Sequence, residues 1–204
     1  MKRMLILIVS LAIAYPAASQ AAAGVGFGAS VGFASYSGDI LPSSGDLGEA
    51  VQYGAVLEIT AFPVIDLELH ANYFSKSFSY TYDIGGVPVN TDFDFRDVSV
   101  KAIAKKNIFP VPMSPLKIYI GAGLGYHMMN TEVALNALGD PALADDPFEL
   151  LSNAGKTSVE GMFGLNLAPP VAPLAVYGQY RFGRILTDNA VRTSEIEAGL
   201  MFKF

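Results

Sequence analysis

The sequence contains no cysteine and no tryptophan, and only two histidines, His70 and His127, in 204 residues. The absence of cysteine excludes disulfides, thiolate metal sites, a cysteine nucleophile and a lipid anchor attached through cysteine. A catalytic serine would need one of the two histidines beside it as a base. The composition therefore leaves few places for enzyme chemistry.

The first two dozen residues indicate a secretory signal peptide. Lys2 and Arg3 precede an apolar run of eleven residues, 4–14, and small residues follow up to Ala23. This run is shorter than the ~20 residues that a membrane-spanning helix needs. A buried N-terminal helix is the alternative, but the run has no polar face. We expect residues 1–21 to be the signal peptide, with cleavage after Ala21 or Ala23, and residues 24–204 to be the mature domain.

Long hydrophobic runs are missing from the rest of the chain, and so is positive charge. Although 51% of the residues are hydrophobic, no apolar stretch after residue 23 reaches the ~18 residues of a membrane helix. An alternating membrane strand resolves this contrast, because only every second residue has to face lipid. Without Lys2 and Arg3, eleven basic residues face nineteen acidic ones, a net charge of −8. That balance argues against nucleic acid as a partner.

The mature sequence divides into about eight segments in which apolar residues alternate with glycine and with polar or charged residues. All charges of these segments fall on one face, and the β-branched and aromatic content favours strands over helices. We therefore predict an all-β fold, an eight-stranded antiparallel up-and-down transmembrane β-barrel. The segments are residues 25–33, 51–61, 65–73, 98–105, 116–128, 157–167, 174–183 and 195–204.

The connections between these segments alternate in character. Those after the second, fourth and sixth segments are compact and contain proline, whereas the others are longer and polar, at roughly 36–50, 83–92, 130–156 and 185–191. Membrane barrels have short periplasmic turns and long extracellular loops. We expect the long connections to be extracellular and, because eight is even, both termini to be periplasmic.

A soluble barrel such as a lipocalin has the same period but turns its apolar face inward. Two features favour the membrane form. The charged face is also rich in glycine, which suits the narrow interior of an eight-stranded barrel. In addition, the chain ends with Leu200, Phe202 and Phe204 at alternate positions.

With this terminal strand the sequence resembles the OmpA/OmpX-type family of small outer-membrane barrels, including its OmpW-like branch. The resemblance implies that Leu200, Phe202 and Phe204 form an assembly signal read by the barrel-assembly machinery. It also implies a monomer that contacts outer-membrane lipids and lipopolysaccharide in a Gram-negative bacterium.

The charged residues of the inward face are nearly balanced in sign, so we expect them to pair inside the lumen. Arg181 and Glu197 should meet near mid-depth, and Glu68 with Lys101, or Asp66 with Lys105, should pair between the third and fourth strands. This arrangement favours a polar plug, with a narrow gated channel as the alternative. The expected network is Glu58, Asp66, Glu68, Lys101, Lys105, Lys117, Glu160, Arg181 and Glu197.

We expect no catalytic residues, no metal and no cofactor. Outer-membrane lipid A deacylases and palmitoyltransferases also use eight strands, but they need a serine, a histidine and an acid at the rim or the lipid face. Both histidines here lie on the inward face and are expected to be ordinary lumen residues. We interpret Asp140, Asp145 and Asp146 as solvated loop acids rather than calcium ligands.

Two segments outside the membrane are candidates for surface contact. After Tyr73 the apolar parity shifts, which predicts an aromatic hairpin above the bilayer, entered through a bulge near Ser75–Ser77. Its free strand edges suit adhesion by strand capture, although the aromatic side chains could simply pack on each other. The apolar connection 133–151 is the candidate for contact with a small apolar ligand, as in OmpW-like proteins. The candidate residues are Phe78, Tyr80, Tyr82, Phe93, Phe95, Leu135, Leu138 and Phe148.

These observations predict a structural or surface-interaction role resembling adhesion. The alternative is a narrow gated conduit for small hydrophobic or ionic solutes, and a lipid-modifying enzyme is disfavoured.

Overall fold

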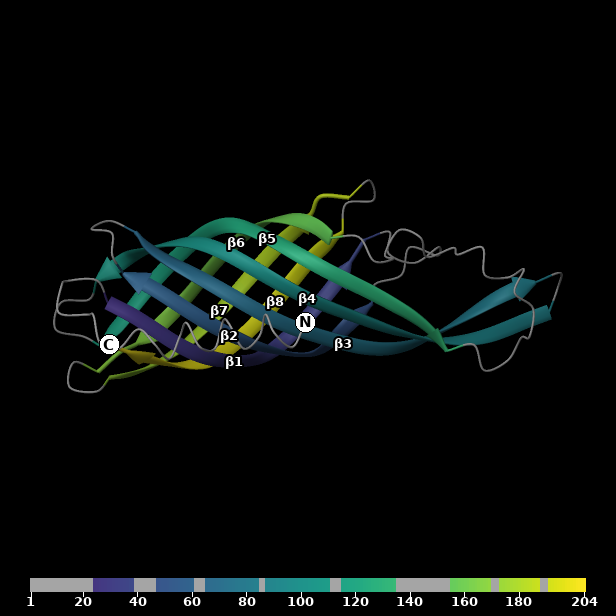
Figure 1. Ribbon diagram of the computed structural model, residues 1–204, viewed down its shortest axis with the longest axis horizontal. Coiled ribbons are helices and arrows are strands. Elements are labelled where there is room, and N and C mark those ends of the chain that lie inside the picture. Colours follow the sequence, from purple (N-terminus) through teal and green to yellow (C-terminus); the bar gives the residue numbers. More distant parts are fainter. Residues whose placement is uncertain are drawn as a thin grey trace, which may run out of the picture.

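The computed structural model describes residues 24–38, 47–60, 65–84, 87–110, 115–134, 155–169, 173–187 and 191–204, which form one closed barrel (Figure 1). The expected signal peptide and its cleavage sites lie outside the described residues. The strands are β1 (Gly24–Ser37), β2 (Gly48–Thr60), β3 (Asp66–Ile84), β4 (Val87–Pro110), β5 (Leu116–Ala134), β6 (Gly155–Leu167), β7 (Leu174–Ile185) and β8 (Arg192–Lys203).

Each strand pairs antiparallel with its neighbour in sequence, and β1 pairs with β8 to close the barrel. The strands run obliquely to the barrel axis, as closure of a small barrel requires (Figure 1). The all-β, eight-stranded up-and-down prediction is therefore confirmed. No helix in the described part of the chain is long and apolar enough to cross a membrane.

The two faces of the barrel wall have opposite polarity. Outward side chains are apolar and exposed, such as Leu124 at 59% and Ile196 at 63%, whereas inward side chains such as Lys101 and Arg181 are fully buried. Apolar surface of this extent around a whole barrel fits a hydrocarbon environment rather than water.

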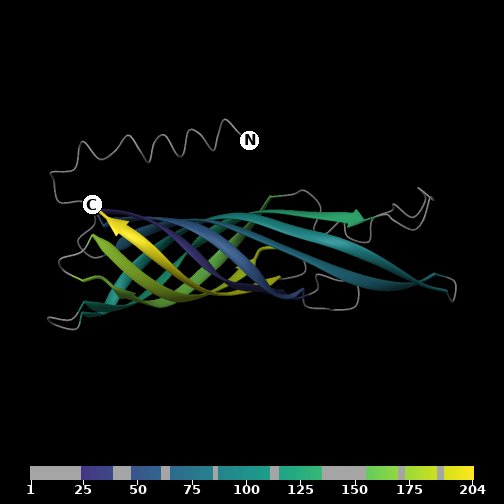
Figure 2. The ribbon, with the colours of Figure 1, turned by 90° about the horizontal axis from the view of Figure 1, so that it is seen from below.

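The two ends of the barrel also differ. We call the end where β1 begins and β8 finishes the terminal end, and the opposite one the hairpin end. At the hairpin end β3, β4 and β5 run well past the other strands as a twisted ribbon (Figures 1 and 2). The pairing of β3 with β4 continues to Ile84 opposite Val87. The prediction of a connection at 83–92 is therefore wrong, because strands occupy most of that segment.

The predicted bulge near Ser75–Ser77 is also wrong, because the register of β3 with β4 runs without a shift from Asp66 to Ile84. Phe74 and Phe78 keep the inward parity of His70 and Asn72. What changes above Tyr73 is polarity, since the inward face becomes aromatic while the outward face becomes polar. The aromatic parity shift in the sequence therefore reflects a change of the medium outside the strand, from hydrocarbon to water, and the strand itself is unbroken.

The same exchange occurs around the barrel and marks the edge of the apolar band. Within the strands, the last outward apolar residues toward the hairpin end are Val51 (40% exposed), Tyr73 (45%), Val98 (38%), Met128 (47%), Phe182 (52%) and Ile196 (63%), and Leu186 (55%) lies just past the end of β7. The outward residue two positions further along each strand is polar: Glu49, Ser75, Arg96, Asn130, Arg184 and Ser194. Such a ring of polarity changes is expected where strands leave the hydrocarbon for the headgroups.

Candidate functional site in the lumen and on the hairpin

At the terminal end the lumen holds a cluster of two acidic and two basic side chains, beside the buried apolar side chains Val56, Tyr177 and Met201. The ammonium group of Lys105 on β4 contacts the carboxylates of both Glu58 on β2 and Glu68 on β3. Lys203 Nζ on β8 lies 2.6 Å from Glu58 Oε1. Lys105 also lies over the ring of Tyr119, 4.7 Å from its centroid. Each charge of this cluster thus has an opposite charge beside it.

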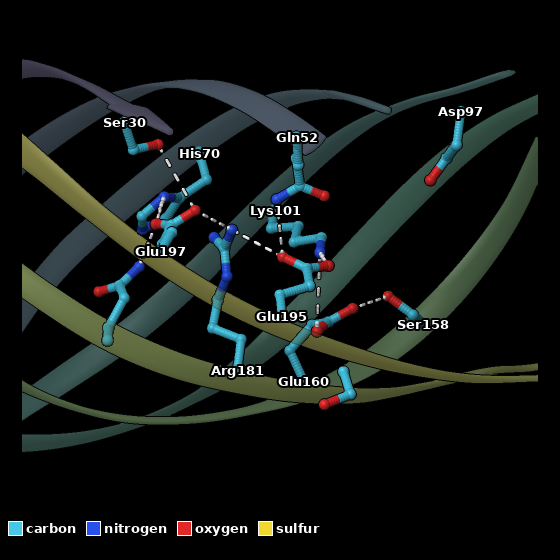
Figure 3. A network of polar contacts seen from close by, with 12 residues as sticks. Ser30, Gln52, His70, Asp97, Lys101, Ser158, Glu160, Arg181, Glu195 and Glu197 are labelled. Atoms are coloured by element: carbon cyan, nitrogen blue, oxygen red, sulfur yellow. Dashed lines mark hydrogen bonds and ion pairs between the residues drawn. The ribbon is translucent and has the colours of Figure 1, made fainter. Parts of the chain in front are cut away.

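Arg181 on β7 forms the centre of the lumen and is fully buried. Figure 3 shows its side chain reaching between two carboxylates of the neighbouring strand β8. Its Nη2 atom lies 2.7 Å from Glu195 Oε2 and 2.7 Å from Glu197 Oε2. Gln179 Nε2 also donates to Glu197, at 2.5 Å. Arg181 and Glu197 therefore meet inside the lumen, as their positions on adjacent strands predict.

The other predicted pairs do not form in the described lumen. Lys101 contacts Glu195 on β8, across the barrel, rather than Glu68. Lys105 is opposite Asp66 in the register but extends to Glu58 and Glu68 instead, while Asp66 accepts a hydrogen bond from Asn107 at 3.2 Å. In so narrow a barrel a long side chain reaches strands beyond its neighbour, and register between adjacent strands does not reveal such partners.

Lys117 does not join the network either. It is the second residue of β5, it is exposed, and no ion pair forms to it from the described residues. At the open terminal end water solvates this charge, so it needs no buried partner. Glu160 does join, because Ser158 Oγ donates to its carboxylate at 2.5 Å and Lys101 Nζ lies 4.0 Å from it.

Nearer the hairpin end, a serine, a histidine and an aspartate line up in the order that hydrolases use. Ser158 Oγ lies 3.0 Å from His127 Nε2, and His127 Nδ1 lies 2.7 Å from Asp97 Oδ2. Ser158 and His127 are fully buried, and Asp97 is 1% exposed. The serine donates its proton to Glu160, and the Tyr36 hydroxyl donates to Asp97 at 2.5 Å. The arrangement therefore lacks both access and a free nucleophile.

An apolar layer covers this cluster at the hairpin end of the lumen. Tyr36, Phe74 and Phe95 pack together, with ring centroids 4.8, 5.4 and 5.9 Å apart. We call the whole layer the apolar cap. It consists of Ala34, Tyr36, Leu47, Phe74, Phe95, Met129, Ile185 and Val191. The cap separates the charged lumen from the space around the ribbon.

The ribbon of β3, β4 and β5 extends from the cap away from the barrel. Phe78 stacks on Phe93 across the strands, with centroids 5.4 Å apart and planes 16° from parallel. On the other face Ser77 donates to Asp94 at 2.5 Å and Ser79 donates to Asp92 at 2.6 Å. The ribbon thus has an apolar face that continues the cap and a polar outer face.

The structure places the predicted surface-contact residues unevenly. Phe93 and Phe95 are 1% and 0% exposed, so their rings pack inside the ribbon and the cap rather than on the surface, and Phe78 is half-buried beside them. The side chains of Tyr80 and Tyr82 lie outside the described part of the chain. So do Leu135, Leu138 and Phe148, as well as the loop acids Asp140, Asp145 and Asp146.

Several members of the lumen network were not predicted from the sequence. Asp97 stands one position before the segment that was counted as a strand, yet it shares the parity of Ser99 and Lys101. Extending the period-two count by one position would have found it. Gln52 donates to Glu195 at 3.0 Å and Tyr119 donates to Gln179 at 2.7 Å, and uncharged partners of this kind carry no signal in a count of charges.

Comparisons with known proteins agree with this architecture. The model of the family described as "Outer membrane protein beta-barrel domain" matches residues 4–204. A major outer membrane protein from Thermus thermophilus is 12% identical with a TM-score of 0.56, covering 90% of this chain and 100% of that chain. Neisserial surface protein A (NspA) is 18% identical with a TM-score of 0.49, covering 90% and 100%. At these identities the structural likeness concerns the fold alone. No curated protein matches the chain.

Proposed function

The chain belongs to the outer membrane protein beta-barrel domain family, and on this premise we propose that it anchors a surface-interaction hairpin in the bacterial outer membrane. The barrel is a small one of the OmpA, OmpX and OmpW type. In this proposal it acts as a monomeric, structural anchor with a closed lumen and has no catalytic role.

The proposed orientation places the hairpin end outside the cell and both termini in the periplasm. Its support is the asymmetry of the connections: at the terminal end they run from 61 to 65, 111 to 115 and 168 to 173. At the hairpin end two connections are clearly longer, from 38 to 47 and from 135 to 154, whereas the one from 186 to 191 is as long as 168 to 173 and β3 and β4 join in a tight hairpin. Short periplasmic turns and long outer loops are the rule for bacterial membrane barrels.

The free edge of β3 carries the proposal of surface interaction. β2 pairs with β3 only as far as Gln52 opposite Phe74, whereas β4 pairs with it to Ile84. Over residues 75–84 β3 therefore has a strand on one side only among the described residues. An extended segment of a partner protein can add to such an edge through backbone hydrogen bonds.

The filled lumen supports an anchor over a conduit. Arg181 holds two carboxylates in the middle of the barrel, and the apolar cap closes its hairpin end. A continuous water path would have to break these contacts, and leaving one buried charge without its partner costs about 3–5 kcal/mol. Gating that rearranges the ion pairs is the basis of the alternative, a narrow conduit for small hydrophobic or ionic solutes.

Planar-bilayer recordings of the purified mature protein separate these functions. We expect no discrete conductance steps from the wild type and leak currents from an Arg181→Ala variant, which opens space in the lumen. Because buried acids outnumber buried bases there, the leak should prefer cations. Regular steps from the wild type would overturn the closed-lumen proposal and make transport the leading function.

A shortened hairpin tests the interaction role. Lys76 and Phe95 are register partners, so replacing residues 77–94 with an Asn-Gly turn keeps the strands aligned. Bacteria displaying the wild type should adhere to surfaces coated with extracellular-matrix proteins, and the shortened variant should lose that adhesion. Surface labelling serves as the control for equal display. Equal adhesion of both chains would overturn the interaction role.

The terminal strand is proposed as the assembly signal. Leu200, Phe202 and Phe204 are all outward, at 51%, 52% and 71% exposure. Phe204 also closes the seam with β1, since its amide donates to the Val25 carbonyl at 2.9 Å. The outward aromatic side chains remain available for recognition by the assembly machinery before the barrel meets lipid.

A further inference from the structure

His127 on β5 has a hydrogen-bond acceptor at each of its two ring nitrogens. Its Nδ1 atom lies 2.7 Å from Asp97 Oδ2, an oxygen that also accepts from the Tyr36 hydroxyl. Its Nε2 atom lies 3.0 Å from Ser158 Oγ. Ser158 uses its one proton to donate to Glu160 at 2.5 Å, so its oxygen accepts from the imidazole. Both ring nitrogens therefore have to donate, and a histidine that donates from both nitrogens is the imidazolium cation.

The charges that face this ring favour the cation. Asp97 Oδ2 on β4 and Glu160 Oε1 on β6 lie 2.7 Å and 3.5 Å from its nitrogens. Of the neighbouring cations, Lys101 contacts Glu195 on β8, and Lys156, the register partner of the histidine on β6, is half-buried near the strand end. Within the described lumen, buried carboxylates outnumber buried lysines and arginines, so a positive ring reduces this imbalance.

Asp97 connects this histidine to the apolar cap. The Tyr36 hydroxyl donates to Asp97 at 2.5 Å, and the Tyr36 ring packs on Phe74 and Phe95 in the cap. Asp97 is 1% exposed beneath the cap, and its ion pair is with His127. A neutral ring would leave this carboxylate buried without that counter-charge, which is strongly unfavourable until water or a cation reaches it. Water from the hairpin end reaches Asp97 when Tyr36 moves aside.

We propose that His127 is held as an imidazolium cation that keeps the apolar cap closed, and that loss of its proton opens the hairpin end of the lumen. The inference rests on the closed lumen of the proposed function and adds its regulation. In the proposed orientation this end faces the outside of the cell, so the cap responds to an alkaline medium there. His70 differs, because its Nε2 contacts Glu68 at 3.0 Å while its Nδ1 has no hydrogen-bond partner among the described residues. One proton therefore suffices for His70.

The charge of the ring is measured by nitrogen-15 NMR of the detergent-solubilised mature protein, labelled at histidine and carrying no histidine tag. The chain has two histidines, so the spectrum contains two rings, and His70→Gln assigns them. At neutral pH we expect both nitrogens of His127 to have the shifts of an imidazolium. A non-protonated nitrogen on this ring at neutral pH would overturn the proposal. So would a ring that stays charged up to about pH 9, below the range in which lysine and tyrosine titrate.

Opening of the cap is measured at a single introduced cysteine, since the chain has none. Ala34→Cys places it in the cap, where Ala34 is 1% exposed. A charged methanethiosulfonate reagent labels the folded and the urea-unfolded protein at the same pH. The ratio of the two rates is the protection of the thiol, and the effect of pH on the thiol itself cancels. We expect protection to fall by about tenfold or more as the His127 ring becomes neutral. Constant protection across this titration would overturn the proposed opening.

Substitutions separate the charge of His127 from its packing. His127→Gln is neutral at every pH, so the cap cysteine should lose its protection already at neutral pH. Adding Asp97→Asn removes the carboxylate without a counter-charge and should restore much of the protection. His70→Gln is the matched control, because it exchanges the other buried histidine in the same way and should leave the cap protected.

Equal loss of protection in both histidine variants, or no recovery with Asp97→Asn, would overturn the role of the His127 charge. Unchanged heat-modifiable mobility on gels shows that each variant is folded. Wild-type conductance steps at neutral pH would instead overturn the closed lumen itself, so failure of this inference is distinct from failure of the proposed function.

Discussion

Replacing Arg181 by methionine should destabilise the barrel strongly, because two buried carboxylates would lose their shared cation. Arg181 is fully buried and lies 2.7 Å from an oxygen of Glu195 and of Glu197. Methionine retains much of the volume, so the change removes mainly charge. In a dry lumen the two acids then repel each other without an intervening positive group.

The expected loss follows from what each carboxylate retains. Breaking a buried pair by removing one partner costs about 3–5 kcal/mol. Glu195 keeps Lys101 and Gln52, and Glu197 keeps Gln179. Arg181 also engages both acids through Nη2 alone, while its Nε and Nη1 atoms donate to no partner among the described residues. We therefore expect the lower end of the range, about 3 kcal/mol.

The assay is urea unfolding in phosphatidylcholine vesicles, followed by far-ultraviolet circular dichroism because the chain has no tryptophan to report by fluorescence. Arg184→Met is the control. Arg184 lies three residues further along the same strand but is exposed and outward, so its loss should change stability by no more than about 0.5 kcal/mol. Adding Glu197→Gln to Arg181→Met should recover part of the lost stability, because it removes one of the two buried carboxylates that no longer have Arg181 as a partner.

A loss for Arg181→Met as small as that of the control would refute this reasoning. It would mean that water reaches the middle of the lumen and solvates Glu195 and Glu197 when the arginine is absent. The lumen would then be a hydrated passage, and the closed-lumen proposal would lose its physical basis.

Four further predictions follow from the same structure. Leu124→Lys, on the lipid face, should cost about 2–4 kcal/mol in bilayers, whereas Glu49→Lys above the apolar band should cost at most about 1 kcal/mol; equal costs would show that the band is placed wrongly. Phe93→Ala removes the buried partner of Phe78 and should make the ribbon, but not the barrel, sensitive to limited proteolysis; an unchanged digestion pattern would contradict the packing described. A fluorophosphonate probe should leave Ser158 unlabelled in the folded protein, since the side chain is fully buried, and stoichiometric labelling detected by mass spectrometry would reopen the question of catalysis. Phe204→Ala should lower the amount of barrel assembled in cells while leaving refolding into detergent unchanged, and equal amounts in cell fractions would argue against its role as an assembly signal.

The barrel itself was predictable from the sequence because the pattern that identifies each strand lies within a short stretch of the chain. A strand that faces lipid on one side and a narrow lumen on the other must alternate, and this alternation appears in every strand from Phe27–Phe33 in β1 to Ile196–Phe202 in β8. The contact between Arg181 and Glu197 was predictable for the same reason. Both side chains point inward from adjacent antiparallel strands at similar depth.

The choice of partners across the lumen was not predictable in this way. Lys101 pairs with Glu195 on β8, and Lys105 pairs with Glu58 on β2. Neither contact joins adjacent strands, so each depends on the tilt and closure of the whole barrel. The alignment of Ser158, His127 and Asp97 joins adjacent strands, and each contact lies two residues from a register partner. It was not predicted because Asp97 stands one position before the segment that was expected to be a strand.

In β3 the same two-residue alternation of side chains continues through two environments, hydrocarbon and water. Below Tyr73 the odd positions of β3 are apolar and face lipid, while the even positions His70 and Asn72 are polar and buried. Above Tyr73 the odd positions Ser75 and Ser77 are polar, and the even position Phe74 joins the cap. The strand does not change its direction or its register there, so the sequence must exchange its polarity where the medium outside changes from hydrocarbon to water. A parity shift that is accompanied by this exchange therefore marks a membrane boundary, whereas a parity shift within one medium marks a bulge.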